Sequence, residues 1–104
     1  PRILLLDEPF SALDMAHTYV VMSLLKNLTQ QQQLLTIFVT HDLNFALLNA
    51  DTVLLMKEGS LSGYGAPASV LNTNRIADVF GVRTRMEQSS RGQPFIFIDG
   101  PITQ

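Results

Sequence analysis

The chain has 104 residues, 46% of them hydrophobic and 15% charged, which is typical of one globular domain and not of a disordered segment. The net charge of -2 gives no electrostatic support for binding a phosphate backbone, so no nucleic-acid partner is expected. Because there are no cysteines, disulfides, cysteine-based zinc sites and thiol catalysis are excluded. The longest apolar stretch, at residues 34–39, is far shorter than the roughly 18 residues that a membrane helix needs.

The chain begins with a predicted strand and a predicted helix. The apolar run at residues 3–6 is typical of a strand covered on both faces, and Pro9 ends it because proline has no N–H for the ladder. Asp14 is expected to cap the helix that follows. The apolar residues of this helix recur on one face, at Val21, Leu24, Leu25 and Leu28.

Further strands and helices alternate along the chain. A second strand is predicted at residues 34–40 and, after a helix capped by Asp42, a third at residues 53–56. Glu58-Gly59 is expected to form a tight turn, after which residues 61–64 return as an antiparallel edge strand. The alternation of strand and helix predicts parallel βαβ units.

The rest of the chain predicts short helices and a hairpin. A short helix at residues 68–71 precedes a second one, which Thr73 is expected to cap and Gly81 to close. Two strands follow, at residues 83–87 and 95–98, joined by a polar turn. All four residues of the last strand are apolar, which predicts burial on both of its faces.

Polar residues stand at the carboxyl ends of the first two strands, where α/β proteins bind ligands. Asp7 and Glu8 are neighbours on a strand, so their side chains point to opposite faces and serve different purposes. One carboxylate could hold Mg²⁺ and the other could accept a proton from water. The alternative is that these residues, and His41 after the second strand, simply cap strand ends. His17 is expected on the surface of the first helix.

Three segments in this order resemble the motifs of ABC-type ATPases. Residues 3–9, Ile-Leu-Leu-Leu-Asp-Glu-Pro, resemble their Walker B segment. Residues 11–14, Ser-Ala-Leu-Asp, are similar to their D-loop, and Thr40-His41-Asp42 is similar to their switch-histidine segment. The resemblance implies an α/β fold: a partial P-loop NTPase domain of parallel strands and helices, with a small helical and β-hairpin extension. It implies an ATPase core at residues 1–65 and the extension at 66–104.

The same resemblance implies a role for each of four residues. Asp7 would coordinate Mg²⁺, and Glu8 would be the general base or would orient the attacking water. His41 would contact the γ-phosphate of ATP. Asp14 would contact the partner subunit across a nucleotide-sandwich dimer. The implied cofactors are therefore ATP and Mg²⁺, with Asp7 and Asp14 as cofactor-binding residues and Glu8 and His41 as catalytic ones.

Two motifs of these ATPases are missing from the sequence. No G-x-x-x-x-G-K-[ST] phosphate loop occurs in it, and the LSGGQ-type signature would lie before Pro1. Leu61-Ser62-Gly63 is interpreted as a chance likeness to that signature. The chain is therefore expected to be the C-terminal part of a longer protein and to have no ATPase activity alone. The alternative is a truncated, non-catalytic remnant or interaction module.

Four further segments resemble the ATP-binding subunits that import iron-siderophore complexes, haem or vitamin B12. They are residues 13–17, residues 40–44, residues 65–67 together with 70–71, and residues 79–82. An ATPase subunit of another importer class is the alternative. The resemblance implies a peripheral location at the cytoplasmic face of the cell membrane. The implied partners are a membrane permease subunit, a second copy of the ATPase subunit and, indirectly, a periplasmic or surface binding protein.

Overall fold

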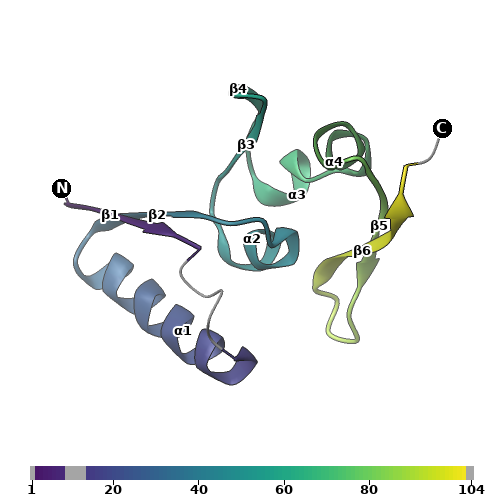
Figure 1. Ribbon diagram of the computed structural model, residues 1–104. Helices are drawn as coiled ribbons and strands as arrows, with labels where there is room; N and C mark the ends of the chain where they lie inside the picture. The colour runs from purple at the N-terminus through teal and green to yellow at the C-terminus, as the bar shows by residue number, and fades with distance from the viewer. Residues whose placement is uncertain (1, 9–13, 103–104) are drawn as a thin grey trace. The chain divides into compact units, whose positions relative to one another are not determined.

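The computed structural model describes residues 2–8 and 14–102 (Figure 1). The chain divides into two compact units, the first ending at His41 and the second beginning at Asp42. The division predicted at residue 65 concerns an ATPase core and its extension, and it stays a prediction.

The first unit is a parallel βαβ arrangement, as the sequence predicts. It consists of β1 (Arg2–Asp7), α1 (Met15–Gln31) and β2 (Leu34–Val39). The two strands pair in parallel, from Arg2 opposite Leu34 to Asp7 opposite Val39. Helix α1 packs on one face of this pair, where the Thr29 and Thr36 hydroxyl oxygens lie 2.7 Å apart.

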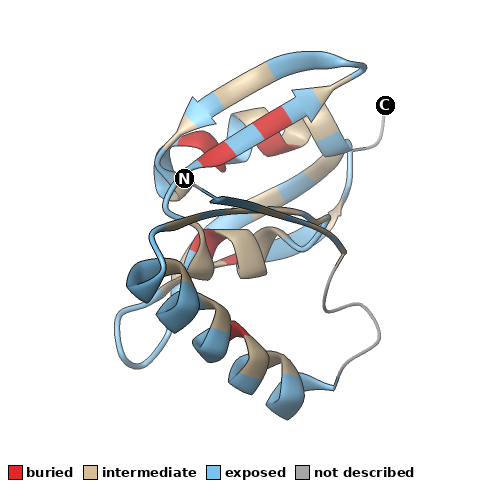
Figure 2. Ribbon diagram, turned by 90° about the vertical axis from the view of Figure 1, so that its left-hand side faces the viewer, coloured by how far each residue is buried: buried red, intermediate tan, exposed pale blue. Residues whose placement is uncertain are grey.

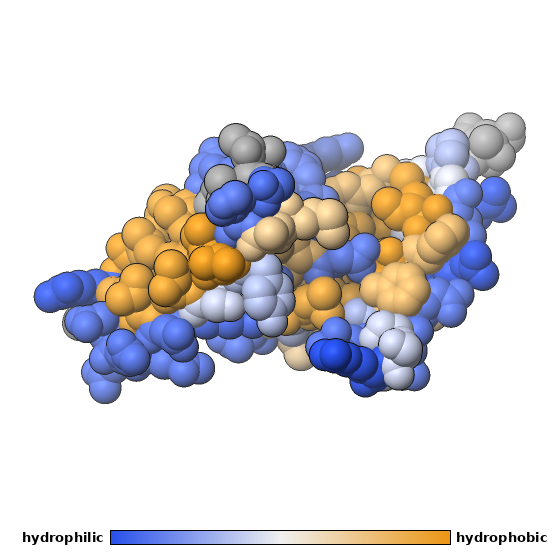
Figure 3. Space-filling model, turned by 90° about the horizontal axis from the view of Figure 1, so that it is seen from below, coloured by the Kyte–Doolittle hydropathy of each residue, from blue (hydrophilic) through white to orange (hydrophobic). Residues whose placement is uncertain are grey.

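The prediction that β1 is buried on both faces is wrong for the described residues. Ile3 and Leu5 are 68% and 67% exposed, whereas Leu4 and Leu6, on the face that α1 covers, are half-buried (Figure 2). The reason is that this unit supplies a helix for one face of the sheet only, and parallel strands need a layer on each face for full burial. Apolar side chains consequently reach the surface of the molecule (Figure 3).

The described residues of the second unit, 42–102, form seven elements. They are α2 (Leu43–Asn49), β3 (Val53–Lys57), β4 (Ser60–Gly65), α3 (Pro67–Val70), α4 (Thr73–Phe80), β5 (Val82–Gln88) and β6 (Pro94–Pro101). No helix among the described residues is both long and apolar enough to cross a membrane.

Two antiparallel hairpins form the strands of this unit. Strands β3 and β4 pair through Glu58 and Gly59, whose φ values of 52° and 80° make the predicted tight turn. The third predicted strand and the antiparallel strand predicted to return after it are confirmed as β3 and β4. The predicted C-terminal hairpin is confirmed as β5 and β6. The expected burial of β6 on both faces is wrong, since Phe97 and Ile98 are 46% and 56% exposed.

The ends of α4 show one correct prediction and one error. Gly81 closes the helix with a φ of 69°, which glycine adopts without strain, as predicted. The N-cap is Asn72, whose side chain accepts a hydrogen bond from the N–H of Arg75, and not Thr73, which is the first helical residue. Both residue types are good caps, and asparagine at N-cap is the slightly stronger one.

A small apolar core holds the second unit together. Its buried members are Leu47, Val53, Leu55, Val70, Leu71, Ile76 and Ile96. Gly63 lets β4 approach this core closely, because a Cβ there would lie 2.9 Å from Arg75 Cδ and 3.0 Å from Val70 Cγ1. Val70 is only 2% exposed and has no room to yield, so this position in β4 requires glycine for packing.

Candidate functional site

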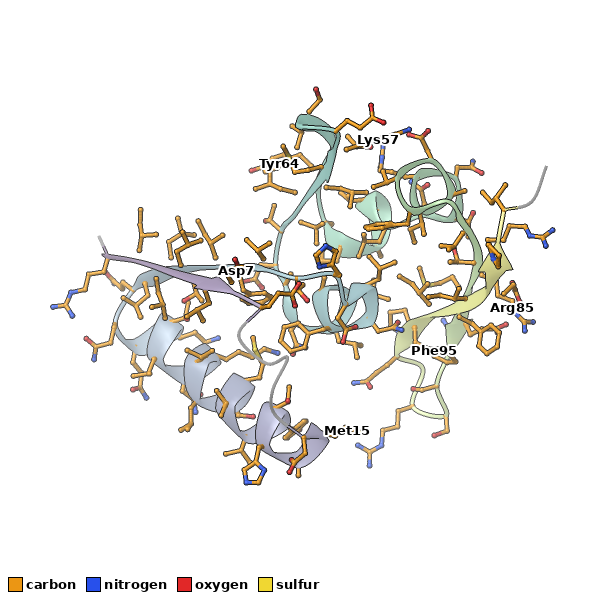
Figure 4. The ribbon with its side chains drawn as sticks, in the orientation of Figure 1. Asp7, Met15, Lys57, Tyr64, Arg85 and Phe95 are labelled. Atoms are coloured by element: carbon orange, nitrogen blue, oxygen red, sulfur yellow. The ribbon has the colours of Figure 1, made fainter. Side chains whose placement is uncertain are left out.

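The carboxyl ends of β1 and β2 bring two of the predicted site residues together. The last residue of β1, Asp7, lies opposite Val39, and the N–H of Glu8 donates to the Val39 carbonyl at 2.8 Å. His41 follows β2 two residues later. Figure 4 labels Asp7 at this end of β1.

Glu8 and His41 are joined by two hydrogen bonds. The Glu8 Oε1 atom accepts one from the backbone N–H of His41 at 3.0 Å and lies 2.7 Å from the ring Nδ1. The Glu8 side chain is 38% exposed and the His41 side chain 86% exposed. The carboxylate is thus held on one side by histidine while the pair stays accessible to a ligand from solvent.

The backbone at Glu8 is left-handed, with a φ of 46°. This conformation places Cβ close to the following carbonyl oxygen and costs a residue other than glycine roughly 1–2 kcal/mol. The extended strand therefore ends before Glu8, and the Glu8 carboxylate lies within hydrogen-bond distance of His41, which follows β2. Strain of this size is common where a side chain must be held for function.

The Glu8–His41 geometry supports proton and phosphate chemistry. An ionised carboxylate can only accept hydrogen bonds, so the ring Nδ1 is the donor to Glu8. When both ring nitrogens carry a proton, Nε2 can also donate to an oxygen of a phosphate. The carboxylate, fixed by histidine, can orient a water molecule and take its proton.

Asp7 is exposed at the end of β1, and Glu8 is half-buried. Their placement on opposite faces stays a prediction, because Glu8 follows the strand with a left-handed backbone. Among the residues that the structure describes, no group of three acidic, histidine or cysteine side chains forms a metal cage. Such a cage is not required for Mg²⁺, which keeps several waters and binds proteins through one or two carboxylates. The hard oxygen donors of Asp7 fit that ion.

Asp14 is the N-cap of α1, as predicted. Its carboxylate accepts a hydrogen bond from the N–H of His17 at 2.9 Å, and both of its oxygens lie 2.8 Å from the ring Nδ1. The structure therefore joins Asp14 to the first turn of α1 and not to the Glu8–His41 pair. His17 lies on the helix surface, as expected, but its pairing with Asp14 was missed. The sequence signal for this pairing is that His17 is the third residue of the helix (N3), a position from which a side chain can reach back to the N-cap residue. The remaining residues of the D-loop-like segment, 11–13, lie outside the described residues.

The cap at Asp14 is expected to titrate in acid. The backbone N–H of His17, and then its ring, hold the pKa of Asp14 below the ordinary value of 3.8. Because the folded-state pKa is lowered, the contribution of the cap to stability is present above pH 3.8 and is lost as the pH falls through the folded value. In NMR titrations, we expect the amide shift of His17 to move with a midpoint below 3.8. Asp14→Asn keeps an acceptor that does not titrate, so its amide shift should stay constant in this range. An identical titration in that variant would contradict the assignment.

Comparison with known proteins identifies several relatives, although no protein-family model matches the chain. The hemin import ATP-binding protein HmuV of Burkholderia cenocepacia (strain HI2424) is 34% identical over 98 residues, covering 94% of this chain and 36% of the relative. HmuV of Rhizobium leguminosarum is 38% identical over 100% of this chain and 39% of the relative.

Two solved structures have a similar fold. One is a metal-chelate type ABC transporter in an inward-facing conformation, with a TM-score of 0.80 and 29% identity over 95% of this chain and 40% of that one. The other is CbiO1 from Clostridium perfringens, part of the ABC transporter complex CbiONQ, with a TM-score of 0.63 and 32% identity over 75% of this chain and 31% of that one.

The chain spans between about a third and two fifths of the length of the curated relatives that it matches. The similarity covers 94% of this chain and agrees with the family that the motif resemblance implies. The fold of the solved structures is the α/β fold that the resemblance implies. The chain therefore belongs with the ATP-binding subunits of ABC transporters, as part of their P-loop ATPase domain.

Proposed function

We propose that this chain is part of the ATP-hydrolysing subunit of an ABC importer. The observation that carries the proposal is the Glu8–His41 pair at the carboxyl ends of two parallel strands, with Oε1 and Nδ1 2.7 Å apart. Phosphoryl transfer depends mainly on positioning and charge neutralisation, and this pair provides one group for water and one for phosphate.

In this proposal, Glu8 orients the attacking water and accepts its proton, while His41 donates a hydrogen bond to the γ-phosphate. The hydrogen bonds from His41 keep the Glu8 carboxylate in one position, so fewer conformations must be lost when water and nucleotide bind. Because the His41 ring would contact both Glu8 and the γ-phosphate, bound nucleotide would help to hold the Glu8 carboxylate in position.

Asp7 would hold Mg²⁺, directly or through water, at the end of β1. The ion, when bound, neutralises charge on the phosphate oxygens. Asp14 would contact a second copy of the subunit across a nucleotide-sandwich dimer. Its carboxylate caps the first turn of α1, the helix that directly follows the D-loop-like segment at residues 11–14.

The proposed cargo is an iron-siderophore complex, haem or cobalamin. The support is the similarity to hemin import proteins and to a metal-chelate type transporter. The proposed partners are a membrane permease, a second ATPase subunit and, indirectly, a periplasmic or surface binding protein, with the chain at the cytoplasmic face of the membrane. Another importer class is the second possibility for the cargo, supported by the similarity to a subunit of CbiONQ.

A non-catalytic remnant is the second candidate function, because the sequence contains no G-x-x-x-x-G-K-[ST] loop. The test is to read the coding sequence before Pro1 in the same frame and to assay the whole product and the 104-residue chain for ATP hydrolysis. We expect a phosphate loop and Mg²⁺-dependent turnover in the whole product, and none in the chain alone. A stop codon or an unrelated sequence before Pro1 would favour the remnant. Turnover by the chain alone would contradict the proposal that the phosphate loop lies elsewhere.

A further inference from the structure

A surface cavity in the second unit lies between α4 and the β5–β6 hairpin, and none of the roles above uses it. Its volume is about 390 Å³, which is within the range of small-molecule sites. Helix α4 lies beside β5 (Figure 1). The residues that line this α4–β5 cavity are Thr73, Asn74, Ala77, Arg83, Thr84 and Asp99. All six belong to the second unit.

The side chain of Thr84 has an unpartnered hydroxyl group. Its oxygen atom is buried and has no hydrogen-bond partner among the described residues, and no other buried side-chain oxygen or nitrogen of those residues is in this state. A buried polar group without a partner costs about 1–3 kcal/mol. A ligand that hydrogen-bonds to Thr84 would therefore remove a cost that the protein alone carries.

The charges around the cavity favour an anion. Among the described residues, the guanidinium group of Arg83 makes no ion pair and no hydrogen bond. The carboxylate at the cavity, that of Asp99, is already engaged, because its Oδ1 lies 3.3 Å from Nε of Arg85. Arg85, which Figure 4 labels, also lies 3.4 Å from a carboxylate oxygen of Glu87, which does not line the cavity. The donors of Arg83 thus remain available for a ligand.

Helix α4 begins at the same cavity. Thr73 and Asn74 are its first two residues, so their N–H groups have no acceptor within the helix. The cap residue, Asn72, accepts from the N–H of Arg75 and leaves these two groups unused. The peptide dipoles of a helix give its start a partial positive charge, which adds to that of Arg83.

A β-bulge lies where Arg83 and Thr84 line the cavity. Arg83 lies opposite Gly100 in β6. The next residue, Thr84, lies opposite Ile98, so Asp99 is the extra residue of the bulge. Neighbours on a regular strand point to opposite faces, whereas Arg83 and Thr84 line one cavity. Bulges redirect side chains in this way and are frequent next to functional sites.

We propose that the α4–β5 cavity binds the anionic group, a phosphate or a carboxylate, of a small ligand. The planar guanidinium of Arg83 can donate two parallel hydrogen bonds to two oxygens of such a group. The Thr84 hydroxyl and the free N–H groups of Thr73 and Asn74 supply further donors. This binding site goes beyond the proposed ATPase function and does not rest on it.

The test is an NMR titration of the isotope-labelled chain with inorganic phosphate and, separately, with acetate, at an ionic strength held constant with chloride. The amide signals of Thr73, Asn74 and Thr84 should move and reach saturation with at least one of the two anions. Arg83→Ala should raise the Kd about tenfold or more, as expected for the loss of hydrogen bonds to a charged group. Arg91→Ala removes the same charge from the turn between β5 and β6 and should leave the Kd unchanged.

The two anions also distinguish the ligand classes. Saturation with phosphate alone would support a phosphate ligand, and saturation with acetate alone would support a carboxylate. Shifts that never saturate, or equal weakening in Arg83→Ala and Arg91→Ala, would show general attraction of anions and overturn the proposal.

Thr84→Val gives an independent readout, because it removes the unpartnered hydroxyl and keeps the branched side chain. We expect this variant to unfold at a higher denaturant concentration than the wild type when no anion is present, and to bind the anion more weakly. Unchanged binding in Thr84→Val would contradict the proposed site.

Discussion

Replacing Glu8 by glutamine is expected to lower ATP turnover of the whole protein by a factor of about 10² to 10⁴, the usual contribution of a general base. Glutamine has nearly the same shape and keeps an acceptor for the two hydrogen bonds from His41. It cannot take a proton from water, so the chemistry is removed while the geometry is kept. Binding of ATP should be unchanged, because the substitution removes no donor to the phosphates.

The chain offers a matched control in Glu58. This glutamate also has a left-handed backbone, with a φ of 52° against 46° at Glu8, but it lies in the turn between β3 and β4. Glu58→Gln should leave turnover and ATP binding as in the wild type. Equal turnover in Glu8→Gln and Glu58→Gln, measured as phosphate release at saturating ATP and Mg²⁺, would reject Glu8 as the base.

Ile76→Ala is expected to lower the free energy of unfolding of the second unit by about 2–5 kcal/mol. Ile76 is 1% exposed and packs in the core that also holds Leu71, at 1% exposed. Removing the buried methyl and methylene groups loses their transfer free energy and leaves a cavity that the surrounding side chains fill only in part. A loss of this size is a large fraction of the stability of a small domain.

Denaturant titrations would measure this loss, followed through the amide signals of β3 and α4 so that only the second unit is monitored. The midpoint should fall while its slope stays constant. Ile98→Ala is the matched control, because Ile98 is 56% exposed, and it should change stability by no more than about 0.5 kcal/mol. Equal losses in the two variants would contradict the described core.

Local chemistry explains which features the sequence could predict. Asp14 and Asp42 precede helices and cap them as expected, because an N-cap depends on the cap and the three residues after it. The placement of Glu8 and His41 was also predictable, since the carboxyl ends of parallel neighbours lie at one edge. The same local rules could not choose between Asn72 and Thr73, which are adjacent and both competent caps.

Features that depend on distant residues were not predictable in this way. An apolar strand such as β1 is equally consistent with burial on one face or on two, because the covering layers are set by tertiary structure. The Asn44 side chain forms hydrogen bonds with the N–H and the carbonyl of Ile96, 52 residues away, and no periodicity or motif in either segment indicates this contact. The motif resemblance includes Asn44, within residues 40–44, but gives this residue no structural role.

The left-handed backbone at Glu8 lowers the stability of the fold, whereas the Glu8 side chain is the proposed base. Folding alone would favour glycine at this position, because glycine adopts a φ of 46° without the steric penalty that glutamate incurs. Glu8→Gly would remove this backbone penalty, whereas Glu8→Ala would keep it, because alanine still carries a Cβ. The glutamate in this position contacts His41, so the proposed site gains its carboxylate at the cost of backbone strain.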